Sequence, residues 1–178
     1  MKLGKQPKFD PESSWAPLEA RIDRENDPRR IQLLEQVRDH MRTEIRGELS
    51  DLMATLVDEP RYHLWGLDVE AGPKGRAAVE EFYSSMIASG GNHFHFDIRR
   101  IVVDEDAVVT EGRMLMRVPG SVLLASGIES VEGEPVDADA TYISSGQILT
   151  VWPAAADGRL MGEDIYMGSP MLSDLRRE

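Results

Sequence analysis

The chain has 178 residues, of which 20 are Lys or Arg and 32 are Asp or Glu, so its formal net charge is −12. This size fits one domain with a short extension, and the acidic balance opposes contact with nucleic acid or an anionic membrane, because such contacts need Lys or Arg. The chain contains no cysteine, which excludes disulfides, thiolate metal sites and a cysteine nucleophile.

The first 26 residues are charged and contain three prolines, with Trp15, Leu18 and Ile22 as the strong apolar residues. We expect an N-terminal arm over residues 1–26 that ends in a short helix and packs on the body or on a neighbouring subunit. The opening segment MKLGKQPKFDPESS has no apolar run after its lysines, so it lacks the pattern of a secretory signal. We therefore expect a cytoplasmic protein.

Three helices are predicted after the arm. The first spans 27–47, because an Asp-Pro pair opens it, its apolar residues recur at spacings of three and four, and a glycine ends it. A second, shorter helix covers 49–57, and a third covers 76–91 with a Gly-Gly stop. Between these two, the aromatic segment RYHLW at 61–65 is typical of a strand, and a glycine-bearing loop follows at 66–75.

The hydrophobic period then changes to two. Strands are predicted over 93–103 and 107–118, joined by an acidic turn, and over 140–152 and 159–167. The stretch 119–139 is rich in Gly, Ser, Glu and Pro and indicates a long loop or an extended hairpin.

Helices followed by a run of antiparallel strands predict an α+β fold. We expect three parts along the chain. They are the arm at 1–26, one domain over 27–168 with the insertion at 119–139, and a C-terminal tail at 169–178.

Three segments carry a family resemblance: GPKGRAAVEEFY at 72–83, VVDEDAVVTEG at 102–112 and VWPAAADGRLMGEDIY at 151–166. In their order and spacing they resemble the SnoaL-like, or nuclear-transport-factor-two-like, superfamily over residues 28–168. The resemblance implies a cone-shaped, curved antiparallel sheet closed by N-terminal helices, a cystatin-like α+β barrel with a pocket inside. The superfamily includes isomerases, dehydratases, cyclases, epoxide hydrolases and binding modules, so the fold does not select a function.

Locally the chain resembles the scytalone dehydratase branch. There a catalytic His in a Gln-His-Phe context precedes the Asp of an acidic turn, as residues 92–94 precede Asp106 here. A first-strand Tyr of that branch falls on Tyr62. The Tyr-Asp pair of its first helix has no match, and the nearest replacements are His40 and Glu44.

Two other branches match less well. The charged triad of the limonene epoxide hydrolase branch falls on Gly112, Met114 and Ile165 here. The base carboxylate of the ketosteroid isomerase branch falls on Trp65 or Gly66.

The resemblance and the residue chemistry together give candidate catalytic residues. His93 is the candidate base, Tyr62 would polarise a substrate oxygen, and Glu44 with His40 would assist the leaving group. The alternatives are a Glu44 paired with an arginine, and a solvated face or a loose metal set made by His93, His95 and Asp97, which alternate on one strand face. Candidate substrate-binding residues are Trp65, His95, Met114, Met116 and Met167.

Further residues are predicted mainly as packing or secondary candidates. Tyr83 and Tyr166 are expected to be structural, and Glu163 could reach the cavity from the last strand.

We expect a cofactor-independent lyase, either a dehydratase or a carbon–carbon lyase, that acts on a small hydrophobic, aromatic hydroxylated compound, with no metal. The alternatives are a non-catalytic binding or interaction domain and an isomerase or cyclase of the same superfamily. We expect a homodimer or a trimer, and no nucleic-acid or membrane partner.

Overall fold

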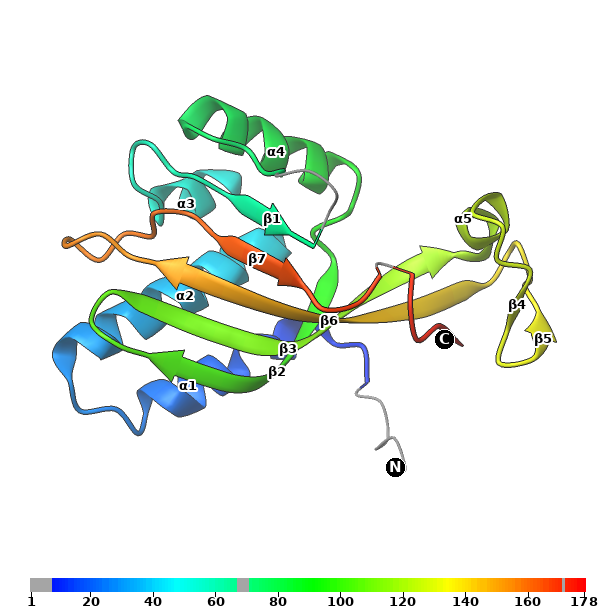
Figure 1. Ribbon diagram of the computed structural model, residues 1–178, viewed down its shortest axis with the longest axis horizontal. Coiled ribbons are helices and arrows are strands. Elements are labelled where there is room, and N and C mark those ends of the chain that lie inside the picture. Colours follow the sequence, from blue (N-terminus) through cyan, green and yellow to red (C-terminus); the bar gives the residue numbers. More distant parts are fainter. Residues whose placement is uncertain (1–7, 67–70, 171) are drawn as a thin grey trace.

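The structure is a computed structural model that describes residues 8–66, 71–170 and 172–178, so the predicted loop at 66–75 lies partly outside the described residues. Helices come first along the chain and a run of strands follows, as the sequence predicts (Figure 1). No helix in the described ranges is long and apolar enough to cross a membrane. The helical elements of the body are the 3-10 turn η1 (Pro11–Ser13), α1 (Ala16–Ile22), α2 (Pro28–Arg46), α3 (Leu49–Ala54) and α4 (Arg76–Ala88).

Helix α2 is the longest helix of the described chain, and local chemistry fixes both of its ends. The Asp27 carboxylate accepts hydrogen bonds from the backbone N–H groups of Arg29 and Arg30 at 2.9 and 3.1 Å, which satisfies donors that have no partner inside the helix. Gly47 ends the helix in the left-handed conformation, with φ of 71°. The predicted start and end of this helix are confirmed.

The main sheet has the strand order β1-β7-β6-β3-β2, with β8 paired to β6. β1 runs parallel to β7, and the other pairings are antiparallel. β1 and β2 are the two edges of this curved sheet, and the predicted cone-shaped α+β fold closed by helices is confirmed. The strands are β1 (His63–Trp65), β2 (Phe94–Val103), β3 (Ala107–Pro119), β6 (Thr141–Pro153), β7 (Asp164–Met167) and β8 (Arg176–Arg177).

A projection extends from one end of the sheet. Strands β3 and β6 pair along their whole length, from Ala107↔Pro153 to Pro119↔Thr141. Their far ends carry α5 (Gly120–Ala125), β4 (Ser130–Val131) and β5 (Glu134–Pro135) away from the body (Figure 1). The insertion predicted at 119–139 is therefore a short helix followed by a hairpin.

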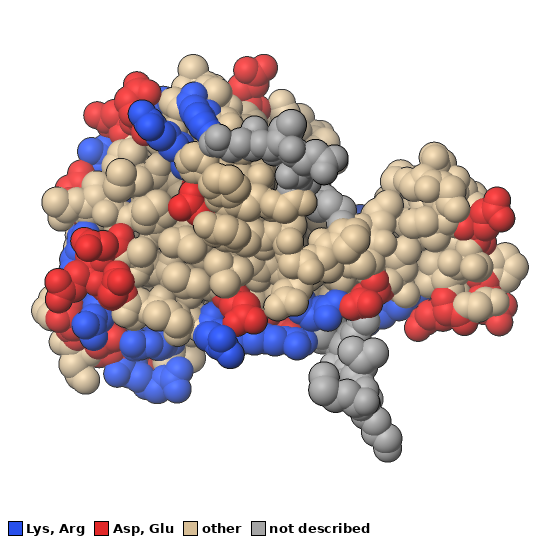
Figure 2. All heavy atoms as spheres, in the orientation of Figure 1, with Lys and Arg blue, Asp and Glu red and all other residues tan. Residues whose placement is uncertain are grey.

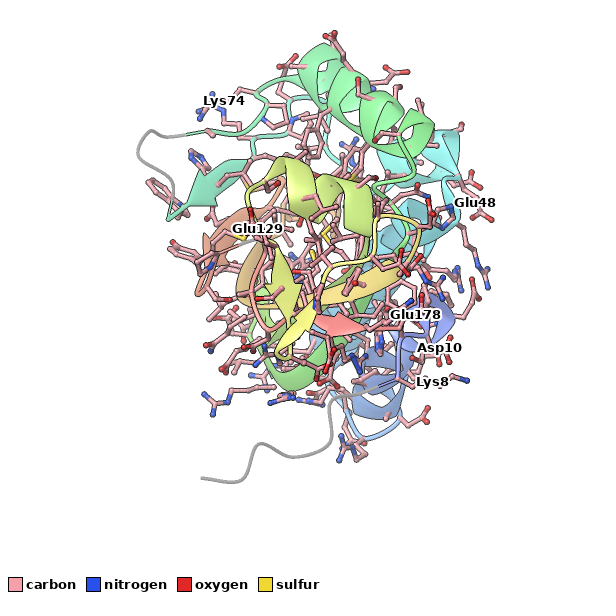
Figure 3. All side chains as sticks on the ribbon, turned by 90° about the vertical axis from the view of Figure 1, so that its right-hand side faces the viewer. Lys8, Asp10, Glu48, Lys74, Glu129 and Glu178 are labelled. Atoms are coloured by element: carbon pink, nitrogen blue, oxygen red, sulfur yellow. The ribbon has the colours of Figure 1, made fainter. Side chains whose placement is uncertain are left out.

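The projection has its own small apolar cluster, formed by Val118, Leu123, Val131 and Tyr142. Acidic side chains gather at its tip (Figure 2), and Glu129 is labelled on it in the end-on view (Figure 3). These carboxylates are exposed to solvent, so the acidic residues of the projection add negative charge to the surface and do not enter the main core.

One face of β2 packs in the main core, and its free edge contacts the N-terminal segment. Phe94, Phe96 and Ile98 are buried in the main core with residues of α1, α2 and α4. The N-terminal segment lies against β2, where the buried Ser14 hydroxyl accepts a hydrogen bond from the Phe96 N–H at 3.0 Å. This contact pairs a backbone donor of an edge strand that would otherwise lack a partner.

Candidate active site

A cavity of about 190 Å³ lies between the sheet and helices α2 and α4. Its walls are overwhelmingly apolar, and five methionines contribute to them. No Lys, Arg or His lines it among the described residues. The apolar lining consists of Met41, Met86, Met114, Met116 and Met167 together with Leu64, Phe82, Phe94, Phe96, Ile148, Trp152 and Ile165.

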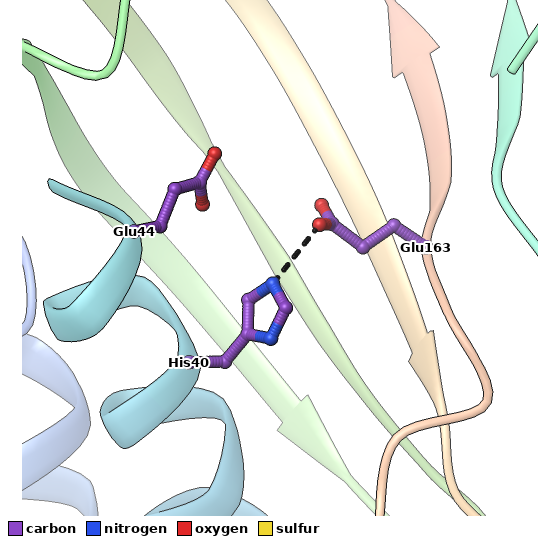
Figure 4. Close-up of side chains that lie close together, drawn as sticks. All are labelled: His40, Glu44 and Glu163. Atoms are coloured by element: carbon purple, nitrogen blue, oxygen red, sulfur yellow. Dashed lines mark ion pairs between the residues drawn. The ribbon is translucent and has the colours of Figure 1, made fainter. Parts of the chain in front are cut away.

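Polar groups come to this cavity from four separate parts of the chain. His40 and Glu44 lie one turn apart on α2, so both project from one face of that helix. Tyr83 comes from α4, Tyr62 directly precedes β1, and Glu163 directly precedes β7. Figure 4 shows the Glu44 and Glu163 carboxyl groups on the same side of the His40 ring.

These side chains form one buried hydrogen-bond network. The Tyr83 hydroxyl donates to Glu163 Oε1 at 2.9 Å and lies 3.0 Å from His40 Nε2. Tyr62 and Tyr83 share a hydroxyl–hydroxyl bond of 2.9 Å. His40 Nε2 is 3.3 Å from Glu163 Oε1 (Figure 4). The imidazole, the phenols and the carboxylate can therefore exchange protons over hydrogen-bond distances.

Glu44 differs from Glu163 in its surroundings. In the part of the chain that the structure describes, no arginine pairs with Glu44, so the expected ion pair at this position is not found. Burial raises the pKa of the Glu44 carboxyl well above its ordinary value, and the charge of Glu163 raises it further. Glu44 is thus suited to be a neutral carboxylic acid beside a carboxylate.

Both tyrosines remain hydrogen-bond donors. Burial, and then the nearby Glu163 charge, raise the pKa of Tyr62 and the pKa of Tyr83 well above the ordinary value. Each phenol is fully buried, with about 1% of Tyr62 and none of Tyr83 exposed. Tyr62 also lines the cavity, so its hydroxyl group can stabilise negative charge on a bound oxygen by donating a hydrogen bond.

The residues that could hold a divalent cation are His40, Glu44 and Glu163. One ligand atom from each lies within 4.8 Å of the others, and imidazole with carboxylates is a donor set that such ions accept. The Tyr83 hydroxyl joins two of these residues, since it contacts both His40 Nε2 and Glu163 Oε1.

Most of the candidate residues chosen from the sequence reach this site. Glu44, Tyr62, Met114, Met116 and Met167 line the cavity. His40 lies directly behind it and contacts Glu163 and Tyr83.

Three candidate residues lie elsewhere, and their expected placement is corrected. His93 is exposed, because it precedes β2 in the turn that follows α4. His95 faces away from the cavity, where Nδ1 accepts a hydrogen bond from the Asp10 N–H at 3.2 Å. Trp65 is 39% exposed and stacks against Tyr166, since its neighbour Leu64 takes the cavity side of β1.

Sequence reasoning underrated three residues of the network. The sequence predicts Glu163 on the last strand, where it alternates with Ile165 and Met167, which both line the cavity. This period of two is the signal that places Glu163 at the cavity. The sequence predicts only a structural role for Tyr83, and no pattern in it points to Thr55, which contacts His40.

Comparison with known proteins establishes the family. The family model for the SnoaL-like domain matches residues 37–148. The chain therefore belongs to the SnoaL-like family. No curated protein matches it.

Solved structures share the fold at low identity. The chain is similar to the epoxide hydrolase/cyclase-like enzyme SalBIII, at 14% identity and a TM-score of 0.55, covering 82% of this chain and 95% of that one. It is similar to an NTF2-like protein of unknown function from Mesorhizobium loti, at 17% identity and a TM-score of 0.55, covering 82% and 98%. It is also similar to a phenazine biosynthesis-related protein from Pseudomonas aeruginosa, at 13% identity and a TM-score of 0.53, covering 79% and 81%. These likenesses establish the α+β fold with its curved sheet.

Proposed function

We propose that the protein is a cofactor-independent acid–base enzyme, a dehydratase-type lyase that removes water from a small, neutral, hydroxylated ring compound. One observation carries this proposal. Two carboxyl groups, Glu44 and Glu163, meet at one apolar cavity, where burial raises the pKa of Glu44 and the Tyr83 hydroxyl donates a hydrogen bond to Glu163. Such a pair supplies an acid and a base at the same pH.

The cavity supports a neutral substrate. Its described lining contains no cationic side chain that would pair with a carboxylate or phosphate group of a ligand. Its volume of about 190 Å³ suits a compound with one or two rings, since an engineered cavity of about 150 Å³ binds benzene. The methionines would adapt to the shape of an aromatic ring.

The reaction needs two proton transfers. The Glu163 carboxylate takes the proton from the carbon next to a substrate carbonyl, and Tyr62 donates a hydrogen bond to the carbonyl oxygen as negative charge develops there. The Glu44 carboxylic acid gives its proton to the departing hydroxyl group. The C–H and C–O bonds break, a C=C bond forms and water leaves.

The pair also resets itself. After one turnover Glu163 holds a proton and Glu44 has lost one. A proton must then move from Glu163 to Glu44, and a carboxyl oxygen of each lies within 4.8 Å of the other. Because these oxygens lie so close together, both can reach one face of a substrate ring, and the proton and the hydroxyl group leave from that face. The proposal therefore includes syn elimination.

The resemblances support an enzyme of this class without fixing the reaction. SalBIII is described as an epoxide hydrolase/cyclase-like enzyme with a role in pyran ring formation. In the present chain Met114 and Ile165 occupy cavity positions where a charged epoxide-opening triad would be expected, so elimination by the Glu pair is the better chemical match.

The test is a screen of neutral β-hydroxy ketones and hydroxylated aromatic ring compounds with purified protein, read by mass spectrometry. We expect a product lighter by one water, and a loss of about 10²–10⁴ in kcat for Glu44→Gln and for Glu163→Gln. His93→Gln is the matched control, because His93 is exposed, and it should keep wild-type activity.

Other outcomes contradict the proposal in distinct ways. A product of unchanged mass would identify an isomerase, and loss of a carbon fragment would identify a carbon–carbon lyase. Binding of the compounds without any product would identify a binding module. Equal activity of wild type and both Gln variants would remove the acid–base pair from the mechanism.

A further inference from the structure

We infer that Thr150 is a substrate-binding residue whose hydroxyl group pairs with a second hydroxyl group on the substrate ring. This inference rests on the proposed function and narrows its substrate class to ring compounds with one neutral oxygen more than the carbonyl and the departing hydroxyl group. Thr150 lies on β6 and lines the cavity, and the two proposed proton transfers do not use it.

The Thr150 hydroxyl group has no hydrogen-bond partner among the described residues. Thr150 is only 3% exposed, and a hydroxyl group so deep in a protein is normally hydrogen-bonded. Its oxygen is not one of the buried polar atoms that the protein encloses without a partner. The hydroxyl group therefore reaches the space of the cavity, and the partner that it lacks must come from there.

The neighbouring Thr110 shows the contrasting case. It lies directly opposite Thr150 in the pairing of β3 with β6 and is fully buried. Its oxygen accepts a hydrogen bond from Trp152 Nε1 at 2.9 Å, so this hydroxyl group serves the fold. Of two threonines side by side on one face of the sheet, Thr110 orients a tryptophan ring and Thr150 keeps its hydrogen-bonding capacity for a ligand.

The other polar side chains that line the cavity already have tasks in the proposed reaction. Tyr62, Tyr83 and Glu163 are joined by hydrogen bonds of 2.9 Å, and Glu44 is the proposed acid. A threonine hydroxyl group does not titrate near neutral pH, so binding is the role that its chemistry favours. It both donates and accepts hydrogen bonds, which matches a hydroxyl group of a ligand.

The sheet places Thr150 across the cavity floor from Tyr62. Thr150 is paired with Ile165 of β7. His63 is paired with Asp164 of the same strand, and Tyr62 directly precedes His63. Neighbouring strands lie about 4.8 Å apart, so about 10 Å of sheet separates the two backbones. A six-membered ring with an oxygen on each side fits between side chains that reach inward from these positions.

This placement would align the substrate for the reaction. The sheet order is β1-β7-β6, so the strand that follows Glu163 runs between the strands of Tyr62 and Thr150. A ring bound through one oxygen to Tyr62 and through the other to Thr150 lies across β7, with its reacting carbon over Glu163. A ring held by Tyr62 alone can turn away, so the second oxygen improves both affinity and orientation.

The direct test uses two neutral ring probes and needs no turnover. Resorcinol and 3-methylphenol differ at one ring position, where a hydroxyl group of the first is a methyl group in the second. Calorimetry measures the dissociation constant of each probe with the wild type, with Thr150→Val and with Thr150→Ser.

We expect the preference for resorcinol over 3-methylphenol to fall by about 5- to 10-fold in Thr150→Val, which is the value of one hydrogen bond. Thr150→Ser retains the hydroxyl group and should keep the preference. The same ratio of dissociation constants in the wild type and Thr150→Val would overturn the inference. So would a wild type that does not bind resorcinol at millimolar concentration.

A second measurement needs no ligand. Thr110→Val leaves the Trp152 N–H without its acceptor, so we expect its melting temperature to fall. Thr150→Val removes a hydroxyl group with no partner in the described parts of the chain, so its melting temperature should equal that of the wild type or exceed it. If it falls as far as that of Thr110→Val, the Thr150 hydroxyl group is bonded within the protein and the inference fails.

These results separate this inference from the proposed function. If Glu44→Gln and Glu163→Gln abolish turnover while Thr150→Val keeps the preference for resorcinol, only the role of Thr150 fails. If the two Gln variants remain active while Thr150→Val loses that preference, Thr150 binds a ring hydroxyl group and the proposed reaction fails.

Discussion

Glu44→Gln should make the protein more stable, and the gain should grow with pH. Burial, together with the Glu163 charge, raises the pKa of Glu44 in the folded chain. Below the ordinary value of 4.5, Glu44 holds its proton in both the folded and the unfolded chain, and glutamine imitates that neutral form. The two proteins should then unfold at the same temperature.

Above pH 4.5, the ordinary pKa of the group, the unfolded chain releases this proton while the folded chain keeps it. The free energy of unfolding of the wild type then falls relative to Glu44→Gln by about 1.4 kcal/mol per pH unit, until the pH passes the raised pKa of the folded state. At about 2–4 °C per kcal/mol for a chain of this size, the gap in melting temperature should open by roughly 3–6 °C per pH unit.

The assay is thermal unfolding followed by circular dichroism at pH values from 4 to 8. Glu35→Gln is the matched control, because Glu35 lies on the exposed side of the same helix, and its curve should follow that of the wild type. In a Glu163→Gln background the gap should stop growing at a lower pH but should still appear, since burial is the larger cause of the raised pKa of Glu44. A gap that does not change with pH would refute the reasoning.

Two further substitutions test the fold. Ser14→Ala leaves the Phe96 N–H without the partner that it has at 3.0 Å, and we expect a loss of about 1–3 kcal/mol in urea unfolding; a loss below about 0.5 kcal/mol would contradict this. Gly112→Ala would bring a Cβ to 2.2 Å from the Asp97 carbonyl oxygen, and we expect a loss of about 3 kcal/mol. Gly146→Ala is its control, since the nearest atom there is a flexible side-chain oxygen at 3.3 Å, and equal losses would disprove the steric argument.

Local signals in the sequence predict most of the fold. An Asp-Pro pair and a glycine define α2, and alternating residues define β2 and β3, because caps and periodicity act within a few residues. The order of the strands in the sheet is harder to predict from the sequence. The parallel pairing of β1 with β7 joins His63 to Asp164, and no local pattern specifies contacts at that distance in the chain.

The candidate site could be predicted only in part. Periodicity showed that His93 and His95 share a side of their strand opposite Phe94, but it could not show which side faces the cavity. That depends on the N-terminal segment, which covers His95 through Asp10. Glu44 is predictable from the sequence, because a carboxyl group on the apolar face of a helix is unusual.

The central claim is that Glu44 holds a proton at neutral pH, because burial and the neighbouring Glu163 raise its pKa. Infrared difference spectroscopy at pH 7 tests it directly, because a protonated carboxyl group has a C=O stretching band that a carboxylate lacks. The account predicts such a band in the wild type, retained in Glu163→Gln and lost in Glu44→Gln. A wild-type spectrum without the band, or a band that only Glu163→Gln removes, would contradict it.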